Sequence, residues 1–461
     1  MIEPISSQSA IPFDECLKIL WERGHELHGK KFGPEPIQAI LKTLGQPERR
    51  YPTAIVAGTN GKGSTSAMLA AILRCAGYRT GLYSSPHLVR VNERIRVNGL
   101  ELSDDDFRAA FTAVHRAVEE LIQAQVLPHR PSFFEYLTAT AFQHFANAAV
   151  DFAVLEVGMG GRLDATNVTD ASVAVITNVD LDHQEFLGNT LTAIAAEKAG
   201  VIKPGRPVVS GCEHPEVREV IRQKCREAGV ELIETRGLQA ASNLFHLDGR
   251  YSFDLQMEGC SLAGITLQMA GRFQIRNAIA AAAAARQLFK AGFQIPPESI
   301  REGLQAARWP GRLEIVRQRP LILLDGAHNT AAAREVAEFV QRHFEGRRLR
   351  LVYASMQDKD IGEISRCLFP LAHTVFLTRP DLDRAASPET ILASAGAEPR
   401  QVIIERDPAR ALEQAVYSSL PEDIVLVAGS LFLVGAIKKA ILDGRLMPER
   451  LAPPEVLSEL C

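Results

Sequence analysis

The chain has 461 residues, of which 46% are hydrophobic and 23% charged, so whole-chain disorder is excluded. A formal net charge of −4, from 51 Lys and Arg against 55 Asp and Glu, excludes the basic field that nucleic acid requires. The seven cysteines are dispersed and odd in number, which argues against a disulfide framework and against a zinc ribbon. At about 100–200 residues per domain, the length predicts two or three domains.

The N-terminal residues carry no basic start followed by an apolar run, so no signal peptide is predicted. The longest apolar stretch, residues 424–437, is too short to span a bilayer, which needs about 20 residues. We therefore expect a cytoplasmic protein with reduced cysteines, no membrane partner and no nucleic-acid partner.

Short β-branched runs alternate with longer helical patterns through the first 210 residues. Strands are predicted at 54–57, 151–157, 172–177 and 207–210. Helices are predicted at 64–76, 133–149 and 190–199. Continuous apolar strands that alternate with helices predict an α/β fold whose mainly parallel sheet is covered on both faces.

The same alternation resumes after residue 310 and predicts a second, smaller α/β unit. Its predicted strands are 320–325, 349–354, 374–377, 402–405 and 424–428, and its predicted helices include 330–344 and 408–418. Residues 230–270 are richer in polar and aromatic residues and are expected to add a small antiparallel element. We place the domain boundary near 308, which gives domains 1–308 and 309–461.

The first chemical signal is a glycine-rich loop, GTNGKGS over residues 58–64, between the first predicted strand and a helix. Its glycines let backbone N–H groups face an anion, and the helix N-terminus adds about half a positive charge. Lys62 would neutralise the β- and γ-phosphates of a nucleotide. The residue after that lysine is Gly63, and a hydroxyl appears only at Ser64, so a magnesium ligand from elsewhere is expected.

Two potential metal ligands follow neighbouring predicted strands. Glu156 lies near the end of strand 151–157, and His183 follows strand 172–177. Ligands bind at the carboxyl ends of strands in open α/β sheets, and a carboxylate suits magnesium. These residues predict a metal site. Lys198 by itself resembles an ordinary surface lysine.

Seven sequence blocks occur in order along the chain: GTNGKGS (58–64), SSPHL (84–88), EVGMGGRLDATN (156–167), LDHQEFLG (181–188), EKAGVIK (197–203), WPGRLE (309–314) and DGAHN (325–329). Together, over residues 15–440, they resemble the folylpolyglutamate synthases, often fused in function with dihydrofolate synthase, of the Mur ligase superfamily. The resemblance implies a P-loop ATPase domain followed by a smaller Rossmann-like domain. It also implies an ATP-dependent amide ligase that activates a carboxylate as an acyl phosphate, which the amine of L-glutamate then attacks.

The resemblance also implies roles for individual residues. It implies that Ser85, Glu156 and His183 are metal ligands and that Lys62, Lys198 and His328 are catalytic residues. Its ATP-binding residues are Asn60, Gly61, Lys62, Gly63, Ser64, Asn277, Arg312 and Asp325. Its substrate-binding residues are Phe134, Arg162, Leu163 and Asp164, with an N-terminal substrate loop at 28–36. Lys198 matches a family lysine that is carbamylated.

Purely structural roles stay open for two of these residues. Phe134 lies at a helix start, where aromatic side chains often belong to the core, and His328 could cap a helix. By resemblance we expect ATP, two Mg²⁺ sites, a possible need for K⁺, and a monomer that binds dihydropteroate, folates and L-glutamate.

The leading prediction is a ligase that adds glutamate to dihydropteroate and to reduced folates. Its alternatives are folylpolyglutamate synthase activity alone, or another Mur-type amino-acid ligase. Ligases of the second kind usually carry a separate N-terminal domain that binds a UDP-sugar, and little room for one precedes the loop at 58. A further alternative is a nucleotide-binding switch without ligase chemistry. Such a protein would not need the DGAHN block of the second domain to face a metal site at Glu156 and His183. A non-catalytic relative is disfavoured because every main motif position holds a chemically competent residue.

Overall fold

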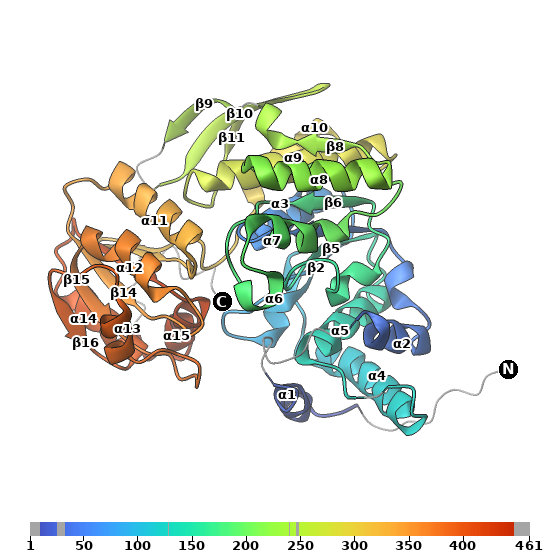
Figure 1. Cartoon of the computed structure of the whole chain (residues 1–461), viewed down its shortest axis with the longest axis horizontal. Helices are drawn as coiled ribbons and strands as arrows, with labels where there is room; N and C mark the ends of the chain where they lie inside the picture. Colours follow the sequence, from blue (N-terminus) through green and yellow to red (C-terminus); the bar gives the residue numbers. More distant parts are fainter. Residues whose placement is uncertain (1–9, 25–32, 128, 239, 246–248, 447–461) are drawn as a thin grey trace.

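The computed structural model describes residues 10–24, 33–127, 129–238, 240–245 and 249–446. These residues form three β-sheets, and helices cover both faces of the two larger sheets (Figure 1). No helix among the described residues is long and apolar enough to cross a membrane.

The first sheet has eight strands in the order β4-β3-β2-β5-β1-β6-β7-β8. Their bounds are β1 Thr53–Ala57, β2 Thr80–Tyr83, β3 Ile95–Val97, β4 Leu100–Glu101, β5 Phe152–Glu156, β6 Val173–Ile176, β7 Val208–Ser210 and β8 Leu232–Glu234. The neighbours from β2 across the sheet to β8 all pair in parallel, and only the pairs β2–β3 and β3–β4 at one edge are antiparallel. Every residue of β1, β5 and β6 is buried, which explains why these strands are continuously apolar.

Alternate residues of each strand face opposite layers of helices. Ala54 and Val56 of β1 pack in one core, whereas Ile55 and Ala57 pack in another. The first core draws on α3 (Lys62–Cys75), α9 (Phe273–Lys290) and α10 (Pro297–Ala306). Helices on the opposite face are α1 (Phe13–Trp21), α2 (Glu35–Thr43), α4 (Asp104–Gln123), α5 (Phe133–Asn147), α7 (Leu191–Lys198) and α8 (Pro215–Ala228).

The second sheet is a small antiparallel one, as expected for residues 230–270. Its strands are β9 (Ala240–Phe245), β10 (Tyr251–Met257) and β11 (Cys260–Thr266). The inward side chains of β10 and β11 join the core that contains α9. The sheet therefore extends the first domain.

The third sheet has six strands in the order β12-β13-β17-β14-β15-β16. Their bounds are β12 Glu314–Gln318, β13 Leu321–Leu324, β14 Leu349–Tyr353, β15 Ala372–Leu377, β16 Val402–Ile404 and β17 Ile424–Ala428. Only β12 is antiparallel. Helices α11 (Thr330–His343), α12 (Ile361–Leu368) and α13 (Pro388–Ser394) cover one face, and α14 (Pro408–Tyr417) and α15 (Leu431–Leu442) cover the other.

The two large sheets are connected by the segment between α10 and β12. Because α10 ends at Ala306 and the third sheet begins at Glu314, we propose a domain boundary at 308. The two halves also touch directly, since a Cβ atom on Gly435 in α15 would overlap the carbonyl oxygen of Leu88. The predicted fold, a large mainly parallel sheet followed by a smaller α/β unit, is confirmed.

Candidate active site

A cavity of about 430 Å³ is lined by loops that follow strands of the first and third sheets. This volume lies within the range of about 300–1,000 Å³ typical of small-molecule sites. Of the residues predicted from the sequence, the cavity is lined by Asn60, Gly61, Lys62, Gly63, Ser64, Ser85, Phe134, Glu156, Leu163, Asp164, His183, Asn277, Arg312, Asp325 and His328. Two predicted residues, Arg162 and Lys198, are not among its lining residues.

The glycine-rich loop between β1 and α3 is fixed by close packing of its backbone. Gly61 has a φ of +80° and is the N-cap residue of α3, and a Cβ atom on it would overlap the amide of Asn277. A Cβ atom on Gly63 would lie 2.5 Å from Nε1 of Trp309. The helix therefore starts two residues earlier than the predicted residue 64, and its N-terminus opens into the cavity.

Lys62 lies in the first turn of α3, and its Nζ donates to the carbonyl of Thr59 at 3.1 Å. Burial lowers the pKa of Lys62, while the carboxylates of Glu156 and Asp182 act in the opposite direction. A half-buried cation beside a helix N-terminus is an arrangement that favours a bound phosphate.

Glu156 and His183 supply a carboxylate and an imidazole to the same cavity. Oε2 of Glu156 accepts from the backbone N–H of Ser85 at 3.2 Å. Burial raises the pKa of Glu156 to about 7, although Lys62 opposes this shift. Burial also lowers the pKa of His183 to about 3, so its imidazole is neutral near pH 7.

A metal ion at this site would have only two side chains among the common Asp, Glu, Cys and His ligands, namely Glu156 and His183. Within the described ranges, no cluster of three or more His, Cys, Asp and Glu residues could hold a metal ion. The predicted set of Ser85, Glu156 and His183 combines a hydroxyl with two such residues. Substrate phosphates would complete its coordination, as Mg²⁺ sites commonly require.

Lys198 and Arg162 lie beside the cavity without lining it. Nζ of Lys198 is buried at the end of α7 and donates to the carbonyl of Gly58 at 2.8 Å. The guanidinium of Arg162 donates twice to Oε1 of Glu197, at 3.1 and 2.9 Å, and its side chain is 57% exposed.

Phe134 forms an aromatic wall of the cavity in the first turn of α5. Its ring lies 5.8 Å from the ring of Tyr83, and a Cβ atom on Gly158 would lie 2.6 Å from its Cζ. Beside it, the buried carboxylate of Asp164 accepts from the N–H groups of Met159 and Thr166, both at 3.0 Å. Burial raises the pKa of Asp164, which these hydrogen bonds counter.

The predicted N-terminal substrate loop contributes only in part. Residues 28–32 of that loop lie outside the described residues, whereas Gly33 and Pro34 line the cavity.

The third sheet contributes the DGAHN loop after β13. Both oxygens of Asp325 accept backbone N–H groups, from Leu313 at 2.8 Å and from Ala327 at 2.7 Å. Nδ1 of His328 donates to the carbonyl of Gly326 at 2.8 Å, and burial lowers the pKa of His328 to about 4. Burial raises the pKa of Asp325, and Arg312, which also lines the cavity, opposes this shift.

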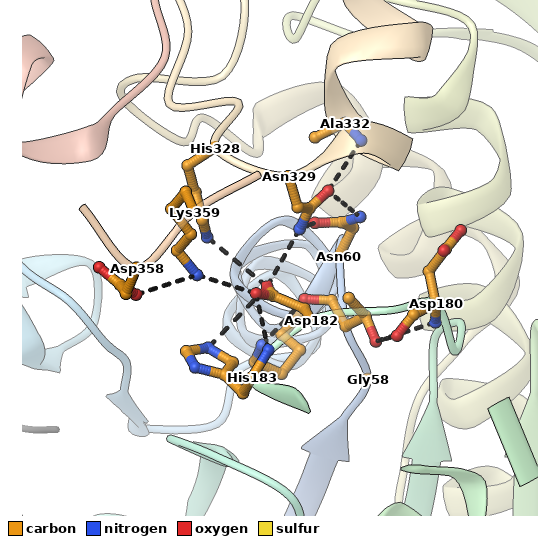
Figure 2. Close-up of polar contacts among 12 residues, drawn as sticks. Gly58, Asn60, Asp180, Asp182, His183, His328, Asn329, Ala332, Asp358 and Lys359 are labelled. Atoms are coloured by element: carbon orange, nitrogen blue, oxygen red, sulfur yellow. Dashed lines mark hydrogen bonds and ion pairs between the residues drawn. The ribbon is translucent and has the colours of Figure 1, made fainter. Parts of the chain in front are cut away.

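Sequence reasoning missed a second polar cluster, centred on Asp182 and shown in Figure 2. Asp182 contacts Lys359 and Asn329 from the third sheet. Asp182 precedes the predicted ligand His183, and Asn329 ends the DGAHN block, so both were inside blocks already singled out. Lys359 follows β14 and could have been found only by inspecting every strand end.

Comparisons with known proteins agree with this geometry. Residues 56–285 match the Mur ligase middle domain, and residues 311–431 match the Mur ligase glutamate ligase domain. The dihydrofolate synthase/folylpolyglutamate synthase of Bacillus subtilis is 34% identical over 422 residues, which cover 90% of this chain and 97% of that protein. The chain belongs to this family of Mur ligases.

Solved structures of the family share the fold. Escherichia coli FolC in complex with DHPP and ADP has 32% identity and a TM-score of 0.83, with coverage of 95% of this chain and 100% of that one. Mycobacterium tuberculosis folylpolyglutamate synthase complexed with ADP has 32% identity and a TM-score of 0.86, with coverage of 93% and 98%. The predicted family, Mur ligase architecture and class of ATP-dependent ligase are confirmed.

Proposed function

We propose that this chain joins the amino group of L-glutamate to the carboxyl group of dihydropteroate, and to that of a tetrahydrofolate, at the expense of ATP. Relatives from Bacillus subtilis and Escherichia coli carry both synthase names, which supports both activities. A relative from Lacticaseibacillus casei is named folylpolyglutamate synthase alone, and this is the second candidate function.

One observation carries the proposal, namely a single cavity that joins three kinds of surface. The phosphate loop lies at one part of it, the aromatic wall of Phe134 with Leu163 at another, and His328 of the third sheet at a third. A nucleotide, a flat aromatic substrate and an amino acid can therefore meet in one cavity.

The chemistry proceeds in two displacements. A carboxylate oxygen of the folate substrate attacks the γ-phosphorus of ATP, ADP leaves, and an acyl phosphate remains. The deprotonated amine of glutamate attacks the acyl carbon, an amide bond forms, and inorganic phosphate leaves. Phosphoryl transfer depends mainly on positioning and charge neutralisation.

We assign the phosphates to Lys62 and to the backbone of residues 60–64. Asn277, Arg312 and Asp325 are assigned to the rest of the nucleotide, and His328 to the amino acid. Phe134, Leu163 and Asp164 are assigned to the substrate pocket, since all three line the cavity.

We assign a divalent metal to Ser85, Glu156 and His183, whose donor set fits Mg²⁺. The raised pKa of Glu156 and the neutral imidazole of His183 both describe a buried site prepared for a cation. A bound metal would neutralise charge on the phosphates. A related structure with Mn, AMPPNP and L-glutamate bound, which has 32% identity and a TM-score of 0.81, supports this assignment.

We further propose that Lys198 is carbamylated and assists a second Mg²⁺. Its neutral amine would attack CO₂ and lose a proton, which places an anion next to the phosphate loop. Its burial and its contact with Gly58 support this proposal. Labelled bicarbonate should give a carbamate signal by NMR, and a short carboxylate should restore activity to Lys198→Ala; absence of both effects contradicts it.

Three smaller predictions accompany this function. A K⁺ requirement is tested by assays in K⁺ and in Na⁺, a monomeric state by light scattering, and a cytoplasmic location by fractionation of the source cells.

The deciding experiment measures phosphate release from ATP with Mg²⁺ and L-glutamate, with dihydropteroate or tetrahydrofolate added and product masses read in parallel. Turnover with both substrates is the expected result. Turnover with tetrahydrofolate alone leaves only polyglutamylation, and no turnover with either favours another Mur-type ligase or a non-catalytic relative.

A further inference from the structure

Asp182 is a carboxylate at which the two halves of the molecule meet inside the cavity (Figure 2). It lies after β6 of the first sheet, and its side chain is 8% exposed. Oδ1 accepts from Nζ of Lys359 at 2.8 Å, and Oδ2 accepts from Nδ2 of Asn329 at 3.1 Å. Nε2 of His328 lies 3.8 Å from Oδ2.

All three of these partners come from the third sheet. His328 and Asn329 follow β13, and Lys359 follows β14. Figure 2 shows their side chains converging on Asp182, with the side chain of His183 also directed toward it. One carboxylate of the first sheet therefore gathers two separate loops of the third.

Asn329 extends this contact to the phosphate loop. Its Nδ2 donates to Oδ1 of Asn60 at 3.0 Å, and Nδ2 of Asn60 donates back to Oδ1 of Asn329 at 3.2 Å. Oδ1 of Asn329 also accepts from the N–H of Ala332 and caps α11. A continuous chain of polar contacts thus leads from Lys359 through Asp182 and Asn329 to Asn60.

The charges in this cluster are balanced and largely removed from water. The side chain of Lys359 is 10% exposed, and its other carboxylate neighbour, Asp358, lies farther away at 3.9 Å and is 41% exposed. Removal of one partner of a buried ion pair leaves the other charge unpaired, so this contact strongly favours one arrangement of the loops.

We propose that Asp182 is a positioning residue for the ligation step, which holds the third-sheet loops of Lys359 and Asn329 against the phosphate loop. It thereby aligns the amino-acid side of the cavity with the acyl phosphate formed on the other side. The kinetic consequence rests on the proposed function, whereas the structural consequence, docking of the two sheets, does not.

The test compares Asp182→Asn, Lys359→Met, the double variant and Asp358→Asn, each in the full chain. We measure kcat, the KM values for ATP and L-glutamate, the affinity for a non-hydrolysable ATP analogue, and the radius of gyration by small-angle X-ray scattering. Asp358→Asn is the matched control, because it removes the exposed and more distant carboxylate beside the same lysine.

We expect Asp182→Asn and Lys359→Met each to lower kcat by about tenfold or more, because each leaves a buried charge unpaired. The affinity for the ATP analogue should stay within about threefold of wild type. The kcat of the double variant should be no lower than that of the poorer single variant, because both residues act through one contact. The kcat of Asp358→Asn should stay within about twofold of that of wild type, since exposed ion pairs contribute little. Both single variants should have a larger radius of gyration than wild type with the ATP analogue bound.

Three results would overturn the inference. These are an unchanged kcat, a loss of ATP-analogue affinity as large as the loss of kcat, or single effects that multiply in the double variant. If thermal unfolding shows that Asp182→Asn does not fold, Lys359→Met carries the test from the opposite side of the pair. If wild type does not ligate glutamate but the variants expand, the proposed function fails and the docking role of Asp182 stands.

Discussion

The loops of the first sheet and those of the third sheet, which face each other in the cavity, are held in different ways. The phosphate loop is held by backbone packing, because Gly61 and Gly63 leave no room for a side chain. The third-sheet loops are held by side chains that reach across, such as Lys359 to Asp182. The phosphate loop is therefore largely preformed by close packing, and among the described residues of this loop only Asn60 bonds to the third-sheet loop, through Asn329. The amino-acid side is complete only when both sheets are docked.

Removing the charge of Lys62 should break the preformed side most severely. Lys62→Met keeps most of the length of the side chain but leaves the phosphates without the ammonium group of Lys62, so we expect kcat to fall about 100- to 1,000-fold. Phosphate release measures the effect. Lys290→Met is the control, because Lys290 lies in the last turn of α9, outside the cavity, and pairs with Glu258. Near-normal turnover of Lys62→Met would contradict the assignment of Lys62 to the phosphates.

A methyl group on Gly63 should damage the same side through packing alone. The added carbon would meet the indole of Trp309, and overpacking of this kind costs about 1–3 kcal/mol, so we expect ATP-analogue affinity to fall about tenfold or more. Gly362→Ala, in α12, is the matched control, since its nearest new contact is an ordinary 3.4 Å to the carbonyl of Ser394. Calorimetric titration that gives equal affinities for the two variants would show that the loop is not held by packing.

Glu156 sharpens the comparison because its charge depends on what occupies the preformed side. With a pKa of about 7 in the metal-free protein, Glu156 is mostly protonated at pH 6 and mostly ionised at pH 8. Mg²⁺ must displace the proton, so its apparent affinity should be about tenfold weaker at pH 6 than at pH 8.

The same shift has a consequence for stability. Because folding raises the pKa of Glu156 above its usual 4.5, the metal-free protein loses stability as the pH rises from about 4.5 to 7. Added Mg²⁺ should therefore raise the Tm more at pH 8 than at pH 6. Persistence of both pH effects in Glu156→Gln would assign them to another group.

The docked side is tested at α15, where a Cβ atom on Gly435 would overlap the carbonyl oxygen of Leu88. Gly435→Ala should push the two sheets apart and lower kcat about threefold to tenfold, while ATP-analogue affinity falls less than kcat does, because the packing of Gly61 and Gly63 is untouched. Steady-state kinetics and calorimetry measure the two quantities, again beside Gly362→Ala. A parallel loss of ATP affinity would mean that the phosphate loop also depends on docking.

The preformed side was the part most accessible from sequence. Glycine spacing and the ends of apolar strands are local features, so the amino-acid order alone places Lys62, Glu156 and His183 at one edge of a sheet. Lys359 has no local motif, and its importance depends on how two distant sheets face each other. Sequence therefore predicts which groups a single sheet presents, but not which of them meet across the domains.

Arg162 shows that sequence also does not reveal which of several neighbouring residues face the cavity. Its truncation should have the smallest effect on activity. Sequence grouped it with Leu163 and Asp164, yet only those two line the cavity, while Arg162 pairs with Glu197 at the surface. A half-exposed ion pair contributes at most about 1 kcal/mol, so Arg162→Ala should change the KM for dihydropteroate less than about threefold and leave kcat unchanged. Phe134→Ala is the informative partner, because its ring lines the cavity. A rise in KM for Arg162→Ala as large as that for Phe134→Ala would mean that the guanidinium leaves Glu197 and reaches the substrate once the pocket is filled.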